Sequence, residues 1–433
     1  MMGSALLGDS TLGLRLGHIL LGSLGSWISY LLFRRLVPPR AALASLLALS
    51  FVPFWFSFAV VATPEGPLLF FWSLALLLFH HASERESIPL SLATGLVVGL
   101  AILCKYNGAL LFASIFLFLW LDPRRPLRKL HPYVALAAAL LVWAPNLLWN
   151  ADHGGTTLGM PFRDGLEPAA APKNLALLML HPFILLTPLL GWAWIRQSIV
   201  GLRSGRLTDD ASFRLSMCAS WVPLGAFAVV ALVTEIHLQW SVVCFVTALP
   251  IALENLARTP VGVSPRFLRT SLATGGALMA LLAIATAAAL ALAHHEGTGK
   301  PEGLARLAVE ARGWDELRER METEIERHSE GRPVFVTAPN KHLAGHLEWL
   351  VGGRYPSQPL DRGRSKQYLV WERDRELVGW DALYVHKRNR EKDEDLLRRS
   401  CRSVEELEPV TIEVGATVPR FVLFWCHEFK GLQ

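Results

Sequence analysis

The sequence predicts a mainly α-helical protein: a bundle of helices that crosses a membrane several times, followed by a small α/β domain outside the membrane. Three observations predict this fold class. The chain has 433 residues, of which 52% are hydrophobic and 18% are charged, and such a composition is typical of membrane proteins. Residues 1–295 are dominated by apolar stretches, whereas residues 296–433 are rich in Arg and Glu and contain only short apolar segments. We therefore expect two domains with a boundary near residue 295.

Ten apolar stretches divide the predicted membrane domain. A helix needs about 20 apolar residues to cross a bilayer. The spans must be helices, because lipid offers no hydrogen-bond partners to the backbone N–H and C=O groups. Seven stretches meet this length, whereas 67–82, 88–104 and 108–121 are at or below it, which would suit tilted, re-entrant or broken helices. The ten stretches are 14–33, 41–62, 67–82, 88–104, 108–121, 132–150, 174–195, 211–234, 239–257 and 267–294.

Basic residues alternate between the connections of these stretches. Every second connection carries most of the Lys and Arg, while the other connections hold only Lys105, Arg163 and Lys173. Because positive residues near spans stay on the cytoplasmic side, we expect a multi-pass protein of the inner (plasma) membrane with both termini on the outer side. The basic set is Arg34, Arg35, Arg40, Arg85, Arg124, Arg125, Arg128, Lys129, Arg196, Arg203, Arg206, Arg258, Arg266 and Arg269.

This orientation makes the first span run from the outside to the inside. The opening residues 1–17 show no cleavable signal peptide. A chain that starts outside the membrane normally has a hydrophobic segment before it, so we expect a further span upstream of Met1.

The net charge of +5 does not indicate a nucleic-acid partner. The excess is largely Arg of the predicted inner loops, which orients helices and meets anionic lipid head groups. Among the cysteines, Cys104, Cys218 and Cys244 lie in or beside spans and are expected to serve packing. Cys401 and Cys426 lie in the outer domain, where an oxidising compartment permits a disulfide.

Residues 296–433 are predicted to form the extracytoplasmic α/β domain. Helices are expected near 301–328 and 340–351. Segments rich in β-branched and aromatic residues predict strands, namely 334–338, 367–371, 382–386, 410–414 and 420–426.

Four outer connections carry polar residues at the mouths of spans, where an outward-facing site would form. They are 63–66, 105–107, 151–173 and 235–239. The third has no obvious regular structure, and loops longer than about 12–15 residues are often functional.

Glu65, Lys105 and Tyr106 are the first candidate residues. An acid flanked by prolines at a membrane boundary is costly without a role, although a carboxylate near a helix start is also mildly stabilising. Lys105 is a cation on the side that otherwise excludes them, which favours a phosphate ligand. The alternative is a snorkelling lysine beside Tyr106 as an interfacial aromatic anchor.

Asn150, Asp152, His153 and Arg163 form a second group. Asp152 and His153 could transfer protons or bind a metal, and Arg163 could pair with a phosphate or carboxylate; a solvated loop is the alternative. A third group, at the start of the ninth stretch, consists of His237, Gln239 and Trp240. His181 lies inside a span, where ionisable residues usually have a role.

Six segments in order give the chain a resemblance to the lipid-linked sugar glycosyltransferases of the GT-C fold, glycosyltransferase family 39, in its bacterial branch. That branch includes protein mannosyltransferase-like and aminoarabinose transferase-like membrane proteins. The segments are LLGDSTLGLRLGHILLGSL (6–24), TPEGPLLFFW (63–72), LCKYNGALL (103–111), LLWNADHGG (147–155), LQWSVVCFVTALP (238–250), and, for the outer domain, ARGWDELRERM (311–321) with GWDALYVHKRN (379–389).

The resemblance implies an inverting transfer of a sugar from a polyprenyl-phosphate donor to a lipid, glycan or protein acceptor at the outer membrane face. Cations and a divalent metal ion, the one cofactor that the resemblance allows, would clamp the phosphate. By position, Glu65, Asp152 and His153 are implied to be catalytic. The residues implied to bind substrate are Lys105, Tyr106, Asn150, Arg163, His237, Gln239 and Trp240.

The chain departs from the family at two points. The family has a first span and an outer loop with the presumed catalytic Asp before the point where this chain starts, so Asp9 does not inherit that role. Glu65 stands where the family usually has Asp. The second hypothesis is therefore a catalytically degenerate protein that binds a lipid-linked sugar or a partner. A transporter is disfavoured because the spans hold few ionisable residues and show no inverted repeat.

Overall fold

The computed structural model describes residues 2–8, 10–52, 55, 57–58, 61–155, 170–254, 265–292, 313–361, 366–371, 373–387, 392–414 and 416–432. The chain divides into two compact units, Met1–Ala280 and Leu281–Gln433, and each has its own hydrophobic core. The boundary near residue 295 that composition suggests falls outside the described residues, so it stays a prediction.

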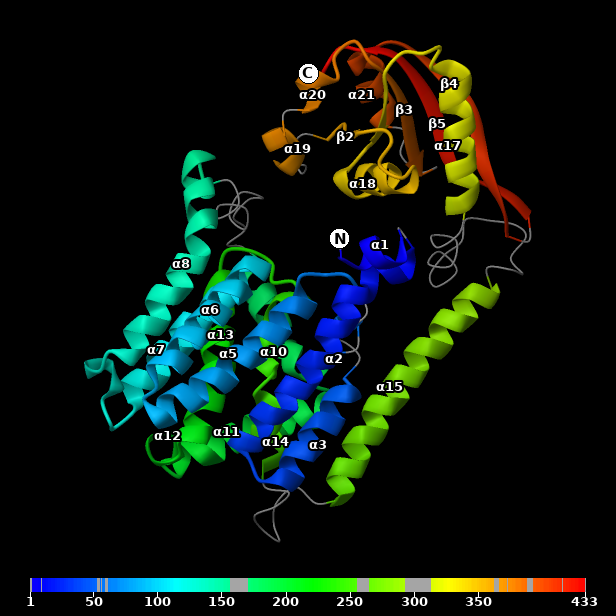
Figure 1. Ribbon diagram of the computed structural model, residues 1–433. Coiled ribbons are helices and arrows are strands. Elements are labelled where there is room, and N and C mark those ends of the chain that lie inside the picture. Colours follow the sequence, from blue (N-terminus) through cyan, green and yellow to red (C-terminus); the bar gives the residue numbers. More distant parts are fainter. Residues whose placement is uncertain are drawn as a thin grey trace. The chain divides into compact units, whose positions relative to one another are not determined.

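The first unit is entirely helical in its described part (Figure 1). Helices α2, α5, α6 and α8 form a row in which each helix packs against the next. The elements are α1 (Met2–Leu7), α2 (Thr11–Leu36), α3 (Pro39–Ser50), α5 (Glu65–Arg85), α6 (Ile88–Cys104), the 3₁₀ turn η1 (Tyr106–Ala109), α7 (Leu110–Leu121), η2 (Pro126–Arg128), α8 (His131–Asp152), α10 (Ala171–Leu185), α11 (Pro188–Arg203), α12 (Arg206–Asp209), α13 (Ala211–Ala231), η4 (Leu238–Phe245), α14 (Ala248–Leu253) and α15 (Pro265–Leu292).

Five helices of the described residues are long and apolar enough to cross a membrane, within α2, α5, α8, α13 and α15. The number is six if the bent pair α10 and α11 counts as one span. Shorter apolar helices are present at α3, α6 and η1–α7. Those at α6 and η1–α7 agree with the short stretches 88–104 and 108–121, whereas the short stretch 67–82 lies within the longer helix α5. The predicted mainly helical membrane bundle is therefore confirmed.

The predicted stretches 174–195 and 239–257 are not straight helices in their described residues. Stretch 174–195 is broken between α10 and α11, which meet at 108°, because Pro188 has no amide hydrogen to continue the helix and Thr187 before it has a φ of 85°. Stretch 239–257 consists of η4 followed by the short helix α14. Apolar content predicted burial at both places but not the breaks.

Helices α6 and α8 approach closely because α6 carries glycine where the two meet. A Cβ on Gly95 would lie 2.1 Å from the carbonyl oxygen of Ala135, and one on Gly99 would lie 2.5 Å from Cβ of Val142. The two glycines are four residues apart, the spacing at which small residues let membrane helices pack backbone to backbone. This contact fixes the end of α8 relative to the end of α6.

We expect Gly95→Ala to destabilise the protein. The added methyl group must displace the Ala135 carbonyl of α8, and overpacking of this kind costs about 1–3 kcal/mol. Gly225→Ala in α13 is the matched control, because its Cβ would meet nothing within 4 Å. Thermal unfolding in detergent should show a lower midpoint for Gly95→Ala alone. Equal midpoints for the two variants would contradict the close approach of α6 and α8.

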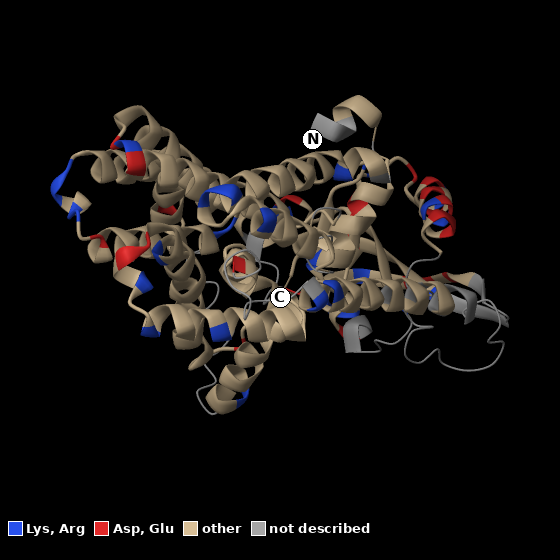
Figure 2. Ribbon diagram, turned by 90° about the horizontal axis from the view of Figure 1, so that it is seen from below, with Lys and Arg blue, Asp and Glu red and all other residues tan. Residues whose placement is uncertain are grey.

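The C-terminal end of α7 and the N-terminal end of α13 meet at a buried ion pair. The Asp122 carboxylate, 2% exposed, accepts a hydrogen bond from Nη2 of Arg124 at 2.7 Å and lies 3.4 Å from Nη2 of the equally buried Arg214. Burial acts to raise the pKa of Asp122, but the hydrogen bonds and charge of Arg124, together with the charge of Arg214, outweigh it and lower the pKa below its usual range. Asp122 is thus ionised at neutral pH. Figure 2 looks at this end of the bundle, where blue Lys and Arg segments lie beside red Asp and Glu segments.

The second unit contains a five-stranded sheet of order β2-β1-β3-β5-β4. Strands β1 (Val334–Ala338), β2 (Ser357–Pro359) and β3 (Asp381–Lys387) are parallel, and β4 (Cys401–Val414) and β5 (Ala416–Phe429) complete the sheet as antiparallel strands. Helices α17 (Trp314–His328) and α18 (Lys341–Leu350) cover one face. Two elements cover the other face of the sheet: helix α21 (Lys392–Ser400) and the segment that follows α20 (Arg373–Glu376). The predicted α/β domain is confirmed.

Residues 367–371 were the wrong prediction in this unit: they lie in helix α19 (Lys366–Trp371) and not in a strand. The β-branched and aromatic content of this segment favours a strand, but in the helix Tyr368 makes a tertiary hydrogen bond with Ser357 at 3.0 Å. Tyr368 and Trp371, three residues apart, are neighbours on the helix with ring centroids 5.2 Å apart. The edge strand β2 was missed because Ser357–Pro359 is short, polar and ends in proline, which is tolerated at a sheet edge.

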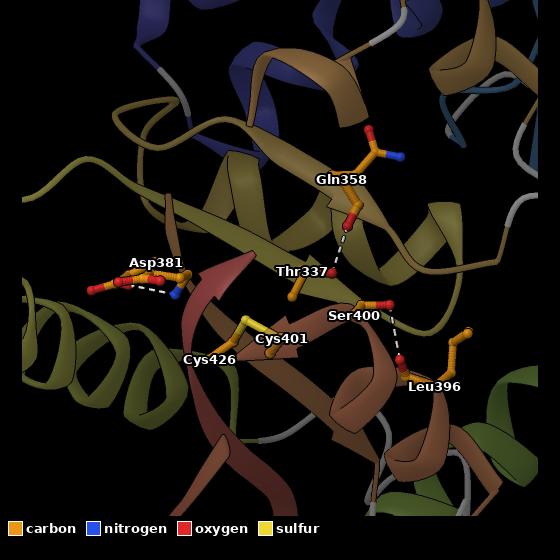
Figure 3. Close-up of a disulfide and its surroundings, with 8 residues drawn as sticks. Thr337, Gln358, Asp381, Leu396, Ser400, Cys401 and Cys426 are labelled. Carbon is orange, nitrogen blue, oxygen red and sulfur yellow. Dashed lines mark hydrogen bonds between the residues drawn. A yellow bond between two sulfur atoms is a disulfide. The ribbon is translucent and has the colours of Figure 1, made fainter. Parts of the chain in front are cut away.

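Cys401 and Cys426, for which the sequence left a disulfide open, form one (Figure 3). It joins the start of β4 to β5 in a part of the sheet where both cysteines are buried. Next to it, the Ser400 hydroxyl donates to the carbonyl of Leu396 at 2.9 Å and so holds the end of α21. Cys104, Cys218 and Cys244 are free thiols in the first unit.

Removal of this disulfide should lower the stability of the second unit. The crosslink spans a separation of 25 residues, and for such a loop the chain-entropy model predicts about 3 kcal/mol. We expect C401S/C426S to show faster hydrogen exchange in β3, β4 and β5 than the wild type. Unchanged exchange in these strands would mean that the sheet does not depend on the crosslink.

Candidate active site

A buried ion pair joins the beginning of α5 to the end of α6. Glu65 is the first residue of α5 and is 4% exposed, and its Oε1 accepts a hydrogen bond from Nζ of Lys105 at 2.5 Å. Of the two side chains, that of Lys105 is the more open, with 23% exposed against 5% for Glu65. Lys105 is thus the more accessible partner of the pair, and its positive charge suits an anionic ligand.

The helical backbone is interrupted at Lys105, which has an extended conformation between α6 and η1. We call residues 105–107 the break. Gly108 makes this break possible: a Cβ there would lie 2.5 Å from the carbonyl carbon of Ala101 in the last turn of α6. Because η1 folds directly against that turn, residues 105–107 protrude from the helix end and can reach several neighbours.

Tyr106 reaches α8. Its hydroxyl donates to Oδ1 of Asn146 at 3.0 Å and accepts from Nδ2 of Asn150 at 3.3 Å. Asn150 is 1% exposed, and its Nδ2 also donates to the carbonyl of Asn146 at 2.9 Å. The structure therefore brings the predicted residues Tyr106 and Asn150 together in one polar cluster beside Lys105.

Asn107 reaches the third neighbour, η4. Its Nδ2 donates to the carbonyl oxygen of Trp240 at 3.1 Å. Three consecutive residues thus connect the break to α5 (Lys105), α8 (Tyr106) and η4 (Asn107). Asn146 and Asn107 were not among the predicted site residues, although each is a polar residue within one turn of a residue that was.

The remaining predicted residues lie at the same helix ends, with contacts that are mainly local. The imidazole of His153 stacks on Trp149 with centroids 4.1 Å apart, and Asp152 is exposed at the last residue of α8. His237 is exposed before η4, with its ring 5.2 Å from that of Trp240, and Gln239 is half-buried. Arg163 lies outside the described residues.

His181 is tied into the same region from α10. Its Nδ1 lies 2.7 Å from Oγ of Ser241, and Ser241 in turn donates to the carbonyl of Leu238 at 3.2 Å. Both side chains are buried. His181 thus anchors η4 to α10, which is a structural explanation for an ionisable residue inside a span.

The described residues do not offer a ligand set for the divalent metal that the resemblance allows. No group of three or more His, Cys, Asp or Glu side chains lies together in the described ranges, and Glu65 is occupied by Lys105. A metal site of protein ligands normally needs several such groups. We therefore assign no step to a metal.

The fold matches that of a solved protein over nearly the whole chain. The structure matches the crystal structure of ArnT from Cupriavidus metallidurans in the apo state with a TM-score of 0.63 at 17% sequence identity, over 98% of this chain and 85% of that chain. The structure of the same protein bound to undecaprenyl phosphate matches with a TM-score of 0.60. The predicted GT-C fold is thus confirmed.

Sequence comparisons match part of the chain to a family model and to two curated proteins. Residues 1–149 match the family model described as dolichyl-phosphate-mannose-protein mannosyltransferase. Lipid A galacturonosyltransferase RgtD of Rhizobium johnstonii is 31% identical over 231 residues, which are 51% of this chain and 45% of that protein. An uncharacterized protein of Aquifex aeolicus is 31% identical over 151 residues, 34% of this chain and 30% of that protein. These matches span less than half the length of the curated relatives.

These matches agree with the resemblance to glycosyltransferase family 39 that the sequence segments carry. The chain is a multi-pass protein of the inner membrane. The motif around Glu65 and the motif around Lys105 both lie within the matched residues 1–149.

Proposed function

We propose that this protein is a glycosyltransferase that moves a sugar from a polyprenyl-phosphate donor to a lipid acceptor at the outer face of the inner membrane. The single observation that carries the proposal is the buried Glu65–Lys105 pair, which offers an ammonium group at the mouth of the bundle. The proposal includes the orientation that basic residues predict, with both termini on the outer side.

Two relatives support the choice of donor and acceptor. RgtD is a lipid A galacturonosyltransferase, which favours a lipid over a glycan or a protein as the acceptor. ArnT of Cupriavidus metallidurans is known in complex with undecaprenyl phosphate, which favours a polyprenyl-phosphate carrier. Both arguments pass from those proteins to this one through the shared family and fold.

Lys105 is the proposed ligand of the donor phosphate. In the reaction an acceptor hydroxyl oxygen bonds to the anomeric carbon of the sugar, the bond from that carbon to the phosphate oxygen breaks, and polyprenyl phosphate leaves. The negative charge on the leaving oxygen grows in this step, so a fixed ammonium beside it stabilises the transition state more than the ground state. Glu65 orients the ammonium before the donor binds.

Glu65 is also the proposed acceptor of the hydroxyl proton. When the phosphate takes a share of the Lys105 ammonium, the carboxylate becomes available beside the reacting carbon, which is the position a general base requires. Asp152 and His153 are the second source of a base. Both are exposed at the end of α8, so an acceptor that arrives from the outer side would pass them.

Tyr106 and Asn150 form the proposed wall of the donor site on the α8 side, and His237, Gln239 and Trp240 form it on the η4 side. Arg163 is also a proposed ligand of the substrate, because it lies in the outer connection 151–173 of the sequence. Phenol, amide and indole groups suit a sugar, because they combine hydrogen bonding with apolar surface.

Transfer can be measured with the purified protein. We expect sugar from a panel of undecaprenyl-phosphate-linked donors, including the galacturonosyl ester, to appear on lipid A in detergent or liposomes. Mass spectrometry of the lipid product identifies the sugar and the acceptor together. If the protein binds undecaprenyl phosphate but forms no product from any of these donors, the proposed transferase activity is refuted, and the protein is a lipid-binding protein.

A further inference from the structure

Asn146 stands at the centre of the polar cluster beside the Glu65–Lys105 pair. Its Oδ1 is approached by three donors: the Tyr106 hydroxyl at 3.0 Å, Nε1 of Trp143 at 3.3 Å and Nδ2 of Asn150 at 3.4 Å. An amide oxygen has two lone pairs, so these donors occupy its accepting capacity fully.

The indole of Trp143 settles which way the carboxamide points. Oxygen and nitrogen of an amide are ordinarily distinguished only by their partners, and Trp Nε1–H is a donor and never an acceptor. The atom that faces Trp143 must therefore be the oxygen. Trp143 lies three residues before Asn146 on the same helix, so this orientation is built into α8.

With its oxygen fixed, Asn146 presents its NH₂ group away from the cluster. The residue is half-buried, and within the described part of the chain its nitrogen donates to no protein acceptor, since all its contacts are made by the oxygen or by the backbone. A donor group that is held in one orientation and left without an acceptor is prepared for a ligand.

We infer that Asn146 is a sugar-binding residue: its NH₂ group donates to a hydroxyl or ring oxygen of the donor sugar while Lys105 holds the phosphate. This inference rests on the proposed function. Tyr106 supplies the geometric link, because it directly follows Lys105 in the chain and hydrogen-bonds to Asn146. The phosphate of one donor molecule would thus meet Lys105, and its sugar would meet Asn146, to which the next residue, Tyr106, is hydrogen-bonded.

The neutral character of Asn146 favours the sugar over the phosphate as its ligand. Charged donors form the stronger bonds to phosphate, and Lys105 already provides one. A fixed amide discriminates instead among neutral hydroxyl groups, because a donor sugar that lacks the matching oxygen leaves the amide unpaired.

The test compares binding of undecaprenyl phosphate with binding of its glucosyl and galacturonosyl esters. Asn146→Asp keeps an oxygen for Trp143 and Tyr106 but removes both N–H donors. Its added negative charge weakens the bare lipid and the neutral glucosyl ester alike, so the ratio of these two affinities isolates the lost hydrogen bond; the galacturonosyl ester, whose carboxylate the new charge also repels, is compared separately. We expect the wild type to prefer a sugar-bearing lipid and Asn146→Asp to reduce that preference by about 10-fold.

Trp143→Phe provides a second variant. It removes the donor that fixes the amide, retains the NH₂ group, and should reduce the preference in the same direction but by less. It also carries the test if Asn146→Asp does not fold. An unchanged ratio in both variants, or no preference in the wild type, would overturn the inference. Retained binding of the bare lipid by E65Q/K105M, with an intact effect of Asn146→Asp on the ratio, would instead count against the proposed role of Lys105.

Discussion

The double variant E65Q/K105M is expected to fold and to lose transfer activity by at least about 100-fold, the cost of removing one electrostatic donor from a transition state. The pair must be replaced together, because K105M alone would leave the buried Glu65 carboxylate uncompensated. The double variant keeps the size of both side chains and removes both charges, so an intact fold with lost activity separates catalysis from stability. Initial rates of sugar transfer measure the effect.

Single variants then assign the two roles. Because Lys105 is proposed to bind phosphate, Lys105→Arg should retain part of the activity, while Glu65→Asp should retain more than Glu65→Gln. Turnover of E65Q/K105M within a factor of a few of the wild type would refute this site. A loss confined to variants of Asp152 and His153 would move the base to the end of α8.

The largest effect on stability is expected for Asp122→Ala. This substitution leaves the guanidinium of Arg214, with 3% of its side chain exposed, without the carboxylate that now lies 3.4 Å away. Removing one partner of a buried pair typically costs about 3–5 kcal/mol. The guanidinium of Arg214 would keep its hydrogen bonds to the carbonyl oxygens of Leu207 and Thr208, but these groups carry no charge to replace that of Asp122. Denaturant unfolding in mixed micelles should show the loss.

Glu86→Gln is the matched control for Asp122→Ala. Glu86 pairs with Lys129 near the same side of the bundle, but the side chains are 46% and 40% exposed, and exposed pairs contribute little. We expect the unfolding midpoint of Glu86→Gln to equal that of the wild type. Equal midpoints for Asp122→Ala and Glu86→Gln would show that the Asp122–Arg214 pair does not stabilise the bundle.

Periodic and compositional signals predicted the parts of the fold that depend on burial. The apolar stretches predicted the helices of the first unit, and β-branched segments predicted β1 and β3, whose central positions in the sheet bury both faces. The same signals misassigned residues 367–371, where the contacts of Tyr368 with Ser357 and Trp371 favour a helix. They also missed the bend at Thr187, since composition carries no information about where a buried helix turns.

The candidate site, like the fold, could be predicted only in part from the sequence. The positions of Glu65 and Lys105 at span ends, on the side with few cations, predicted functional roles for both. Their ion pair could not be predicted, because it joins residues 40 positions apart through the packing of α5 on α6. Asn146 was overlooked because it lies inside an apolar helix, and only the Trp143 and Tyr106 contacts reveal that its amide is oriented.

A structure of the protein with bound undecaprenyl phosphate would test the central claim most directly. We predict density for the phosphate against Nζ of Lys105, with the Glu65 carboxylate on the far side of the ammonium and the amide of Asn146 open toward the place of the sugar. A phosphate bound at another part of the bundle, with the Glu65–Lys105 pair closed and unchanged, would contradict the proposed site.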